Sequence, residues 1–253
     1  VETFGSEENI LKGKSEIVKS SAKKIVCGGE LKEKIAALSL DVLSMSEKEK
    51  CLYADYAALI SDLKLKPHAT SFTLCLPDTD AIAVELPLLG KHSAENVALA
   101  ALLAREMGLT GEEIARGIEG IRPVPHRLQL IEGDGVYILD DSYNANPRGA
   151  REAVEALKRF PARKIVVTPG LVETGILDEK LNGELGAALV GLDEVILVGE
   201  TLVGAVKAGY LEAGGEEEKI VVLPTLDAAQ TRLSETLSAG DCVLFLNDLP
   251  DAW

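Results

Sequence analysis

The sequence predicts an α/β protein in two parts, of which the second is a mostly parallel, doubly wound sheet. From residue 128 onward, short apolar runs rich in Val, Ile and Leu alternate with longer amphipathic segments. This alternation is typical of βαβ units, in which helices cover the faces of a parallel sheet. Before residue 122, two extended runs flank a turn at 77–80, and this pattern predicts a small antiparallel sheet.

The first part should contain helices and short strands in turn. Ser6, which acidic residues follow, and Thr110 are suitable helix N-caps. The predicted helices cover residues 6–21, 30–40, 90–107 and 110–117. The predicted strands cover residues 23–28, 41–45, 52–64, 70–76 and 81–89, and the last two should form a hairpin.

The second part begins after a linker. Pro123 and Pro125 follow a predicted helix closely, so we place a domain boundary near residue 122, between domains over 1–121 and 122–253. No Gly-x-Gly-x-x-Gly occurs in the second domain, so this Rossmann-like sheet lacks the dinucleotide fingerprint. Its predicted strands cover 128–133, 135–140, 164–168, 194–198, 219–223 and 241–246. Its predicted helices cover 147–159, 179–190, 201–213 and 226–238.

Composition excludes several classes of protein. The net charge of −15 and pI near 4.7 argue against a nucleic-acid or anionic-membrane partner. No apolar run reaches the roughly 18 residues of a membrane span, so no membrane insertion is expected. The four cysteines form no C-x-x-C pair, which predicts free thiols in a reducing cytoplasm, and the three histidines show no metal-binding spacing.

The most informative stretch is Asp140-Asp141-Ser142-Tyr143-Asn144-Ala145-Asn146-Pro147. It joins the predicted strand over 135–140 to the predicted helix over 147–159, and Pro147 suits the first helical turn. In open α/β sheets, ligands bind at the carboxyl ends of the strands. Two carboxylates, a phenol and two carboxamides are therefore candidates for ligand binding. The alternative is an ordinary strand-to-helix turn with Asn caps.

This stretch resembles the motif that opens the C-terminal domain of Mur ligases, most closely those of the MurF type. Such enzymes add D-alanyl-D-alanine to UDP-N-acetylmuramoyl-tripeptide. The resemblance implies an ATP-dependent peptide ligase of peptidoglycan synthesis, which acts through an acyl phosphate with ATP and Mg²⁺. The expected partners are a UDP-N-acetylmuramoyl-peptide and an amino acid or dipeptide. Residues 1–121 would be the C-terminal part of the central ATPase-type domain, and 122–253 the C-terminal domain.

The segment Phe4–Ile17 is similar to the central-domain stretch that follows a catalytic histidine in this family. The resemblance implies that Lys14, or Lys12 in a shifted alignment, is carbamylated and holds Mg²⁺. A carbamate supplies the oxygen ligands that Mg²⁺ prefers. The alternative is a solvated helix lysine. Gly13-Lys14-Ser15 is not a P-loop, because Glu8 stands where that motif needs glycine.

Further site residues follow from the same resemblance. Asn96 matches an asparagine that lies near the adenine, although Ser93 departs from the family pattern. Arg127, after His126, matches an arginine that reaches the nucleotide, and its planar cationic fork suits a phosphate. The alternative for Arg127 is an ion pair with a neighbouring carboxylate. Asp141 would act in catalysis, and the other residues expected to line the nucleotide cleft are Tyr143, Asn144 and Asn146.

Two loops depart from the family pattern. Pro169-Gly170 replaces a Gly-Asp pair, although Glu173 and Gly175 match, and Asn247-Asp248-Leu249-Pro250 replaces a Lys-Gly-Ser-Arg motif. The second departure keeps other ligases of the superfamily open, of the folylpolyglutamate, cyanophycin or pseudomurein type. A non-catalytic nucleotide-binding module also stays open. The sequence has no P-loop and starts at Val1, so we expect a fragment that is inactive by itself.

Overall fold

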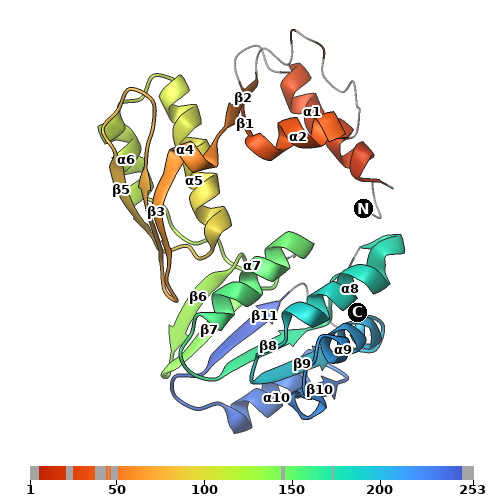
Figure 1. Cartoon of the computed structure of the whole chain (residues 1–253). Coiled ribbons are helices and arrows are strands. Elements are labelled where there is room, and N and C mark those ends of the chain that lie inside the picture. The colour runs from red at the N-terminus through yellow and green to blue at the C-terminus, as the bar shows by residue number, and fades with distance from the viewer. Residues whose placement is uncertain are drawn as a thin grey trace. The chain divides into compact units, whose positions relative to one another are not determined.

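The computed structural model divides the chain into two compact units (Figure 1). The first contains Val1–Lys64, Thr70–Leu86 and Lys91–Ile121, and the second contains Leu65–Ala69, Pro87–Gly90 and Arg122–Trp253. The structure describes residues 6–20, 25–37, 44, 46, 51–143, 146–172 and 174–246. The predicted strand over 41–45 lies outside the described residues apart from Ser44, as do Asn144, Glu173 and the 247–250 segment.

The first unit combines helices with two small sheets. β1 and β2 pair in parallel, and β3, β4 and β5 form a three-stranded sheet in which β4 and β5 are antiparallel. The predicted hairpin is therefore confirmed. The helices are α1 (Glu7–Ser20), α2 (Gly29–Ala37), α4 (Tyr56–Leu59), α5 (Lys91–Glu106) and α6 (Gly111–Glu119). The strands are β1 (Ile25–Gly28), β2 (Cys51–Ala54), β3 (Ile60–Leu65), β4 (Thr70–Leu74) and β5 (Ile82–Leu86).

Local capping explains one success and one error of the prediction. Thr110 caps α6 in a capping box, in which its Oγ1 accepts from the Glu113 N–H at 3.3 Å and the Glu113 carboxylate binds the Thr110 N–H. The single strand predicted over 52–64 is wrong. Asp55 accepts hydrogen bonds from the N–H groups of Ala57 and Ala58, so the chain makes the one-turn helix α4 between β2 and β3.

The second unit is a six-stranded sheet in the order β10-β9-β8-β11-β7-β6. All neighbouring strands are parallel except the antiparallel pair β6 and β7, so the doubly wound, mostly parallel prediction is confirmed. The strands are β6 (Gln129–Gly133), β7 (Val136–Asp141), β8 (Lys164–Thr168), β9 (Glu194–Val198), β10 (Ile220–Leu223) and β11 (Cys242–Leu246). The helices are α7 (Pro147–Lys158), η1 (Gly175–Leu177), α8 (Asp178–Ala188), α9 (Val203–Glu212), η2 (Glu217–Lys219) and α10 (Leu226–Thr236).

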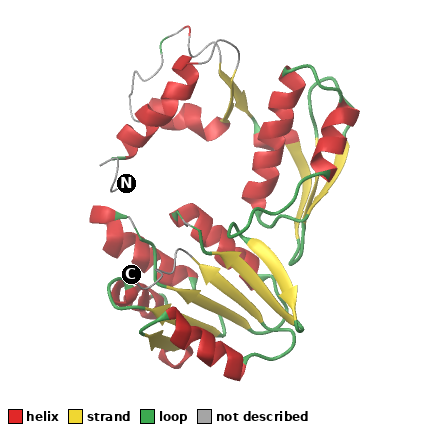
Figure 2. Cartoon of the chain, turned by 180° about the vertical axis from the view of Figure 1, so that it is seen from behind, coloured by secondary structure: helices red, strands yellow, loops and turns green. Residues whose placement is uncertain are grey.

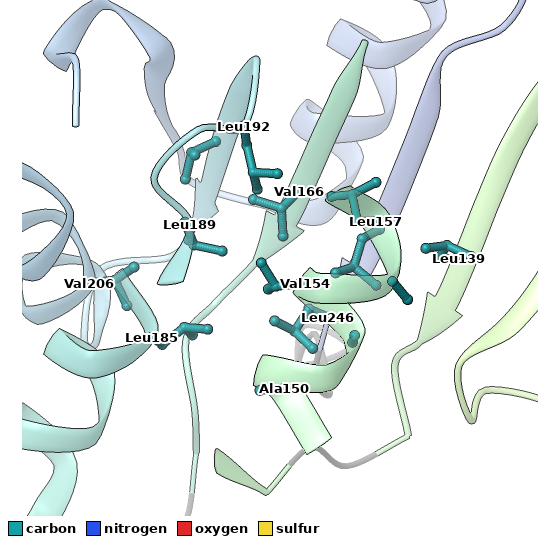
Figure 3. Close-up of a cluster of buried hydrophobic side chains, with 14 of the residues drawn as sticks. Leu139, Ala150, Val154, Leu157, Val166, Leu185, Leu189, Leu192, Val206 and Leu246 are labelled. Atoms are coloured by element: carbon teal, nitrogen blue, oxygen red, sulfur yellow. The ribbon is translucent and has the colours of Figure 1, made fainter. Parts of the chain in front are cut away.

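Helices cover both faces of this sheet. α7, α8 and α9 lie on one face, and α10 lies on the other (Figure 2). Side chains alternate along β8, so Val166 joins the first core whereas Ile165 and Val167 join the second. All of β9 is buried, as expected for a central parallel strand. Figure 3 shows the first core, where aliphatic side chains of strands and helices meet, including Leu139, Val154, Leu157, Val166, Leu189 and Leu246.

Helices α8 and α9 touch backbone to backbone. A Cβ added at Gly186 would lie 2.0 Å from the carbonyl oxygen of Val206, and one at Gly209 would lie 2.0 Å from that of Gly183. Only hydrogen atoms on these Cα positions allow such an approach. In contrast, a Cβ at Gly183 would meet no atom within 4 Å. The glycines in this pair of helices therefore have different structural importance.

A buried ion-pair network closes the amino ends of three strands. Glu194 is 5% exposed and binds Arg163 and the Nε of Arg232, the latter at 2.6 Å. Arg163 also contacts Asp241, 3.4 Å from Nη1 to Oδ2. Pairing satisfies carboxylates that would be costly to bury alone. This charged network lies at the amino ends of the strands, on the opposite side of the sheet from the carboxyl ends of β7 and β8.

Candidate functional site

A tight hairpin brings two sequence motifs together in the second unit. Asp134 and Gly135 connect β6 to β7, and both have positive φ, 51° and 78°, as the favoured two-residue hairpin turn requires. The register pairs Gln129 with Asp140. The loop over 125–128 therefore lies beside residues 140–143, at the carboxyl end of β7.

Hydrogen bonds hold the loop against the end of this strand. The Nδ1 of His126 lies 2.8 Å from Oδ2 of Asp140, and the carbonyl of His126 accepts from the Tyr143 N–H at 3.2 Å. Leu128 donates its N–H to Oδ1 of Asp141 at 2.9 Å. The two adjacent carboxylates thus bind different parts of the same loop.

Arg127 projects from this loop over the ring of Tyr143. The guanidinium carbon lies 4.4 Å from the ring centroid, within the range of a cation–π contact. Both residues are exposed, and 59% of Tyr143 is accessible. A planar cation on an aromatic face suits a phosphorylated or flat ligand, because the guanidinium can donate several hydrogen bonds while it remains stacked.

Burial raises the pKa of Asp141 to about 6, and the neighbouring Asp140 adds a smaller effect in the same direction. The hydrogen bond from Leu128 and the charge of Arg127 oppose this change. A carboxyl group with such a pKa changes charge close to neutral pH. Strongly perturbed carboxyls in polar clusters are typical of functional sites.

The raised pKa makes a testable contribution to stability. Between about pH 4 and pH 6 the folded state binds the Asp141 proton more tightly than the unfolded state, so stability falls as pH rises. Asp141→Asn removes this titration and keeps an oxygen for the Leu128 N–H. Relative to the variant, the wild type should lose on the order of 2 kcal/mol of unfolding free energy across this window. Urea unfolding followed by circular dichroism from pH 4 to pH 7 measures the difference in unfolding free energy between the two proteins. A difference that does not change with pH would contradict the raised pKa of Asp141.

Two matches to known families cover most of the chain. Residues 1–104 match the Mur ligase middle domain, and residues 126–247 match the Mur ligase, glutamate ligase domain. The chain belongs to the Mur ligase family. The resemblance that the Asp140–Pro147 motif indicated is therefore confirmed along both parts of the sequence.

Curated relatives agree with this membership. The chain is 34% identical over 150 residues to UDP-N-acetylmuramoyl-tripeptide--D-alanyl-D-alanine ligase of Escherichia coli K12, covering 58% of this chain and 32% of that protein. It is 28% identical over 165 residues to the Bacillus subtilis protein of the same name, covering 63% and 36%. A probable bifunctional folylpolyglutamate synthase/dihydropteroate synthase of Halobacterium salinarum is 30% identical over 186 residues, covering 72% and 22%. The matched region thus spans less than half of each relative.

Solved structures share the fold. MurF ligase from Thermotoga maritima in complex with ADP has a TM-score of 0.78 at 24% identity, over 97% of this chain and 55% of that one. MurF from Acinetobacter baumannii has a TM-score of 0.76 at 22% identity, over 97% and 53%. These similarities confirm the predicted α/β class, with its small antiparallel sheet and larger, mostly parallel sheet.

The structure places some of the remaining predicted site residues of this Mur ligase family member. Asn146 caps α7, because its Oδ1 accepts from the N–H groups of Arg148 and Gly149 at 3.1 and 2.9 Å. The capping alternative therefore describes what Asn146 does in this structure, and its role toward a nucleotide stays a prediction. Asn144 lies outside the described residues. Asn96 is exposed on α5, where its predicted role near an adenine stays a prediction.

Lys14 is exposed on α1, in the first unit. Gly13-Lys14-Ser15 lies inside this helix, where Ser15 donates to the carbonyl of Leu11 at 2.7 Å, so the exclusion of a P-loop is confirmed. Lys12 pairs with Glu8 at 2.5 Å. The described residues contain no cluster of three or more His, Cys, Asp or Glu that could hold a metal. The carbamate at Lys14 and its Mg²⁺ stay a prediction.

The structure adds His126 to the site and shows that Asp140 binds it. The sequence placed Asp140 among the ligand-binding candidates of its motif, but it gave His126 no role and did not predict the contact between the two. The signal was present, because Asp134-Gly135 between two apolar runs predicts a two-residue hairpin. Counting back from that turn places Gln129 opposite Asp140 and the 125–128 loop beside Asp141 and the residues that follow it.

Proposed function

We propose that the full-length protein carrying this sequence is an ATP-dependent amide ligase of peptidoglycan precursor synthesis. It would join D-alanyl-D-alanine to a UDP-N-acetylmuramoyl-peptide through an acyl phosphate. One observation carries the proposal: Arg127, Tyr143 and Asp141 gather at the carboxyl end of β7 in a chain of the Mur ligase family. The names printed for the Escherichia coli and Bacillus subtilis relatives support this substrate class.

The proposal assigns roles to the chain's own groups. Arg127 would donate hydrogen bonds to a phosphate of ATP, since its guanidinium is exposed and carries a fixed positive charge. Tyr143 would keep that guanidinium oriented by its ring face. One oxygen of Asp141 already binds the Leu128 N–H, and the other would accept a hydrogen bond from the ligand. Catalysis would rest on positioning and charge stabilisation.

The domain assignment forms part of the proposal. Residues 1–121 would be the C-terminal part of the central domain and residues 122–253 the C-terminal domain. The first compact unit ends at Ile121 and the last segment of the second begins at Arg122, which supports this boundary. Asn96 and Lys14 would contribute from the central domain, Asn96 to the nucleotide and Lys14, as a carbamate, to Mg²⁺.

The cellular setting is proposed on separate grounds. All four cysteines, Cys27, Cys51, Cys75 and Cys242, are free thiols, as predicted. Free thiols are typical of a reducing compartment, which supports a cytoplasmic location. Among the described residues, no helix is both long enough and apolar enough to cross a membrane.

A defined assay tests the proposed function. The full-length protein is incubated with ATP, UDP-N-acetylmuramoyl-tripeptide and D-alanyl-D-alanine, while ADP release and product mass are followed. We expect one ADP for each amide bond formed, and no ADP without the peptide substrate. Tight ATP binding without ADP release under any of these conditions would favour the non-catalytic nucleotide-binding module instead.

A second candidate has its own support. The Halobacterium salinarum relative, named as a probable folylpolyglutamate synthase, covers 72% of this chain at 30% identity. A folylpolyglutamate-type ligase would add glutamate to a folate. Testing glutamate with a reduced folate beside D-alanyl-D-alanine with the muramoyl-peptide separates the two, since each substrate pair supports product formation by one enzyme type only.

A further inference from the structure

Two strained residues flank Arg127. His126 and Leu128 have φ values of 63° and 47°, in the left-handed region that residues with a Cβ rarely adopt. Leu128 also fills the core of the second unit, where it is 6% exposed. Such a conformation persists only where the surrounding contacts impose it. The backbone on either side of Arg127 is therefore held in place by other residues.

Asp140 supplies part of that restraint. Its carboxylate is 15% exposed, and Oδ2 binds Nδ1 of His126 at 2.8 Å. Its other oxygen accepts from the hydroxyl and the N–H of Ser142, at 2.7 and 3.2 Å. Asp140 thus ties the loop before Arg127 to the segment that carries Tyr143. Both of its oxygens are occupied by these contacts.

We propose that Asp140 and His126 are positioning residues, which together hold the Arg127 guanidinium over the Tyr143 ring before any ligand arrives. The two adjacent carboxylates would then differ in role: both oxygens of Asp140 hold the protein, whereas Asp141 binds the loop with one oxygen and would bind the ligand with the other. A long arginine side chain that is already ordered loses less conformational entropy when it binds a ligand. That this ordered guanidinium helps to bind ATP rests on the proposed function. That Asp140 and His126 order the guanidinium does not.

NMR of the 253-residue chain tests the positioning directly. The protons of a guanidinium stacked on an aromatic ring resonate upfield, and the Arg127 Nε–H signal is identified by its absence from Arg127→Lys. Asp140→Ala should move this signal most of the way to the position of an unstacked arginine. Glu132→Ala is the matched control, because it removes a carboxylate that contacts His68 at 3.2 Å in the same unit. The control should leave the Arg127 signal unchanged.

A second variant tests the proposal in case Asp140→Ala does not fold. His126→Gly removes the imidazole and every side-chain donor to Asp140, and glycine adopts the positive φ of this position without strain. It should move the Arg127 Nε–H signal toward the position of an unstacked arginine, as Asp140→Ala does. Its thermal unfolding curve should stay close to that of the wild type. An Arg127 signal that keeps its wild-type position in a folded Asp140→Ala or His126→Gly protein would overturn the proposal.

Steady-state kinetics of the full-length protein add a functional measurement. Asp140→Ala should raise the KM for ATP about tenfold with little change in kcat, because a preformed contact stabilises bound substrate and transition state alike. If the Arg127 Nε–H signal shifts but the KM for ATP is unchanged, Asp140 does position Arg127. Arg127 then does not bind the nucleotide. The two ideas can therefore be rejected independently.

Discussion

Replacing Gly186 by alanine is expected to destabilise the second unit by about 3 kcal/mol, the largest effect that we predict for a single methyl group. The new Cβ would lie 2.0 Å from the Val206 carbonyl oxygen and 2.7 Å from the Tyr210 nitrogen. Both are backbone atoms of α9, so no side-chain rotation can relieve the overlap. Urea unfolding followed by circular dichroism should show a clearly lower midpoint.

Gly183→Ala is the matched control for this variant. Gly183 lies one turn earlier in α8, and a Cβ there would meet no neighbour. Because alanine is a better helix former than glycine, this change should leave stability unchanged or raise it by up to about 1 kcal/mol. Equal unfolding midpoints for the two variants would show that α8 and α9 are not in backbone contact.

If the full-length protein has the proposed ligase activity, Arg127→Met should lower its kcat/KM for ATP about 100-fold, which corresponds to about 2.7 kcal/mol. Methionine keeps much of the apolar stem but removes the fixed charge and the forked donors that a phosphate would bind. Initial rates of ADP release at varied ATP concentration measure the effect. Thermal stability should change little, because Arg127 is exposed.

Two further variants show whether this loss of activity comes from a specific contact of Arg127 or from the change in net charge. Arg116→Met removes an exposed positive charge from α6, where no proposed site residue lies, and should leave the kinetics unchanged. Arg127→Lys keeps the charge but loses the planar stacking on Tyr143, so its activity should fall between wild type and Arg127→Met. An equal loss in Arg116→Met would mean that net charge, rather than a specific contact, supports the reaction.

The sequence predicted the elements of the second unit well because their hydrophobic patterns are local. Residues 165–167 of β8 and 195–198 of β9 are continuous apolar runs, as expected for parallel strands that are buried on both faces. Prediction failed over 52–64, where the side chain of Asp55 satisfies two backbone N–H groups and starts a helix. That competition depends on a single cap, which an apolar pattern does not record.

The sequence identified most residues of the site but not the contacts between them. The Asp140–Pro147 motif and Arg127 were both identified as ligand-binding candidates, yet the contact between His126 and Asp140 depends on the β6–β7 register. The raised pKa of Asp141 depends on burial, which no local pattern states. Asn146 shows the opposite case, since a capping role is local and was recognised as the alternative.

The position of β11 has a consequence for synthesis on the ribosome. β7 and β8 follow one another in the chain, yet β11 lies between them and pairs with both. The emerging polypeptide therefore presents two unpaired strand edges until its last described strand has left the exit tunnel. We expect nascent chains that stop before Cys242 to bind chaperones or aggregate, because exposed edges recruit other strands.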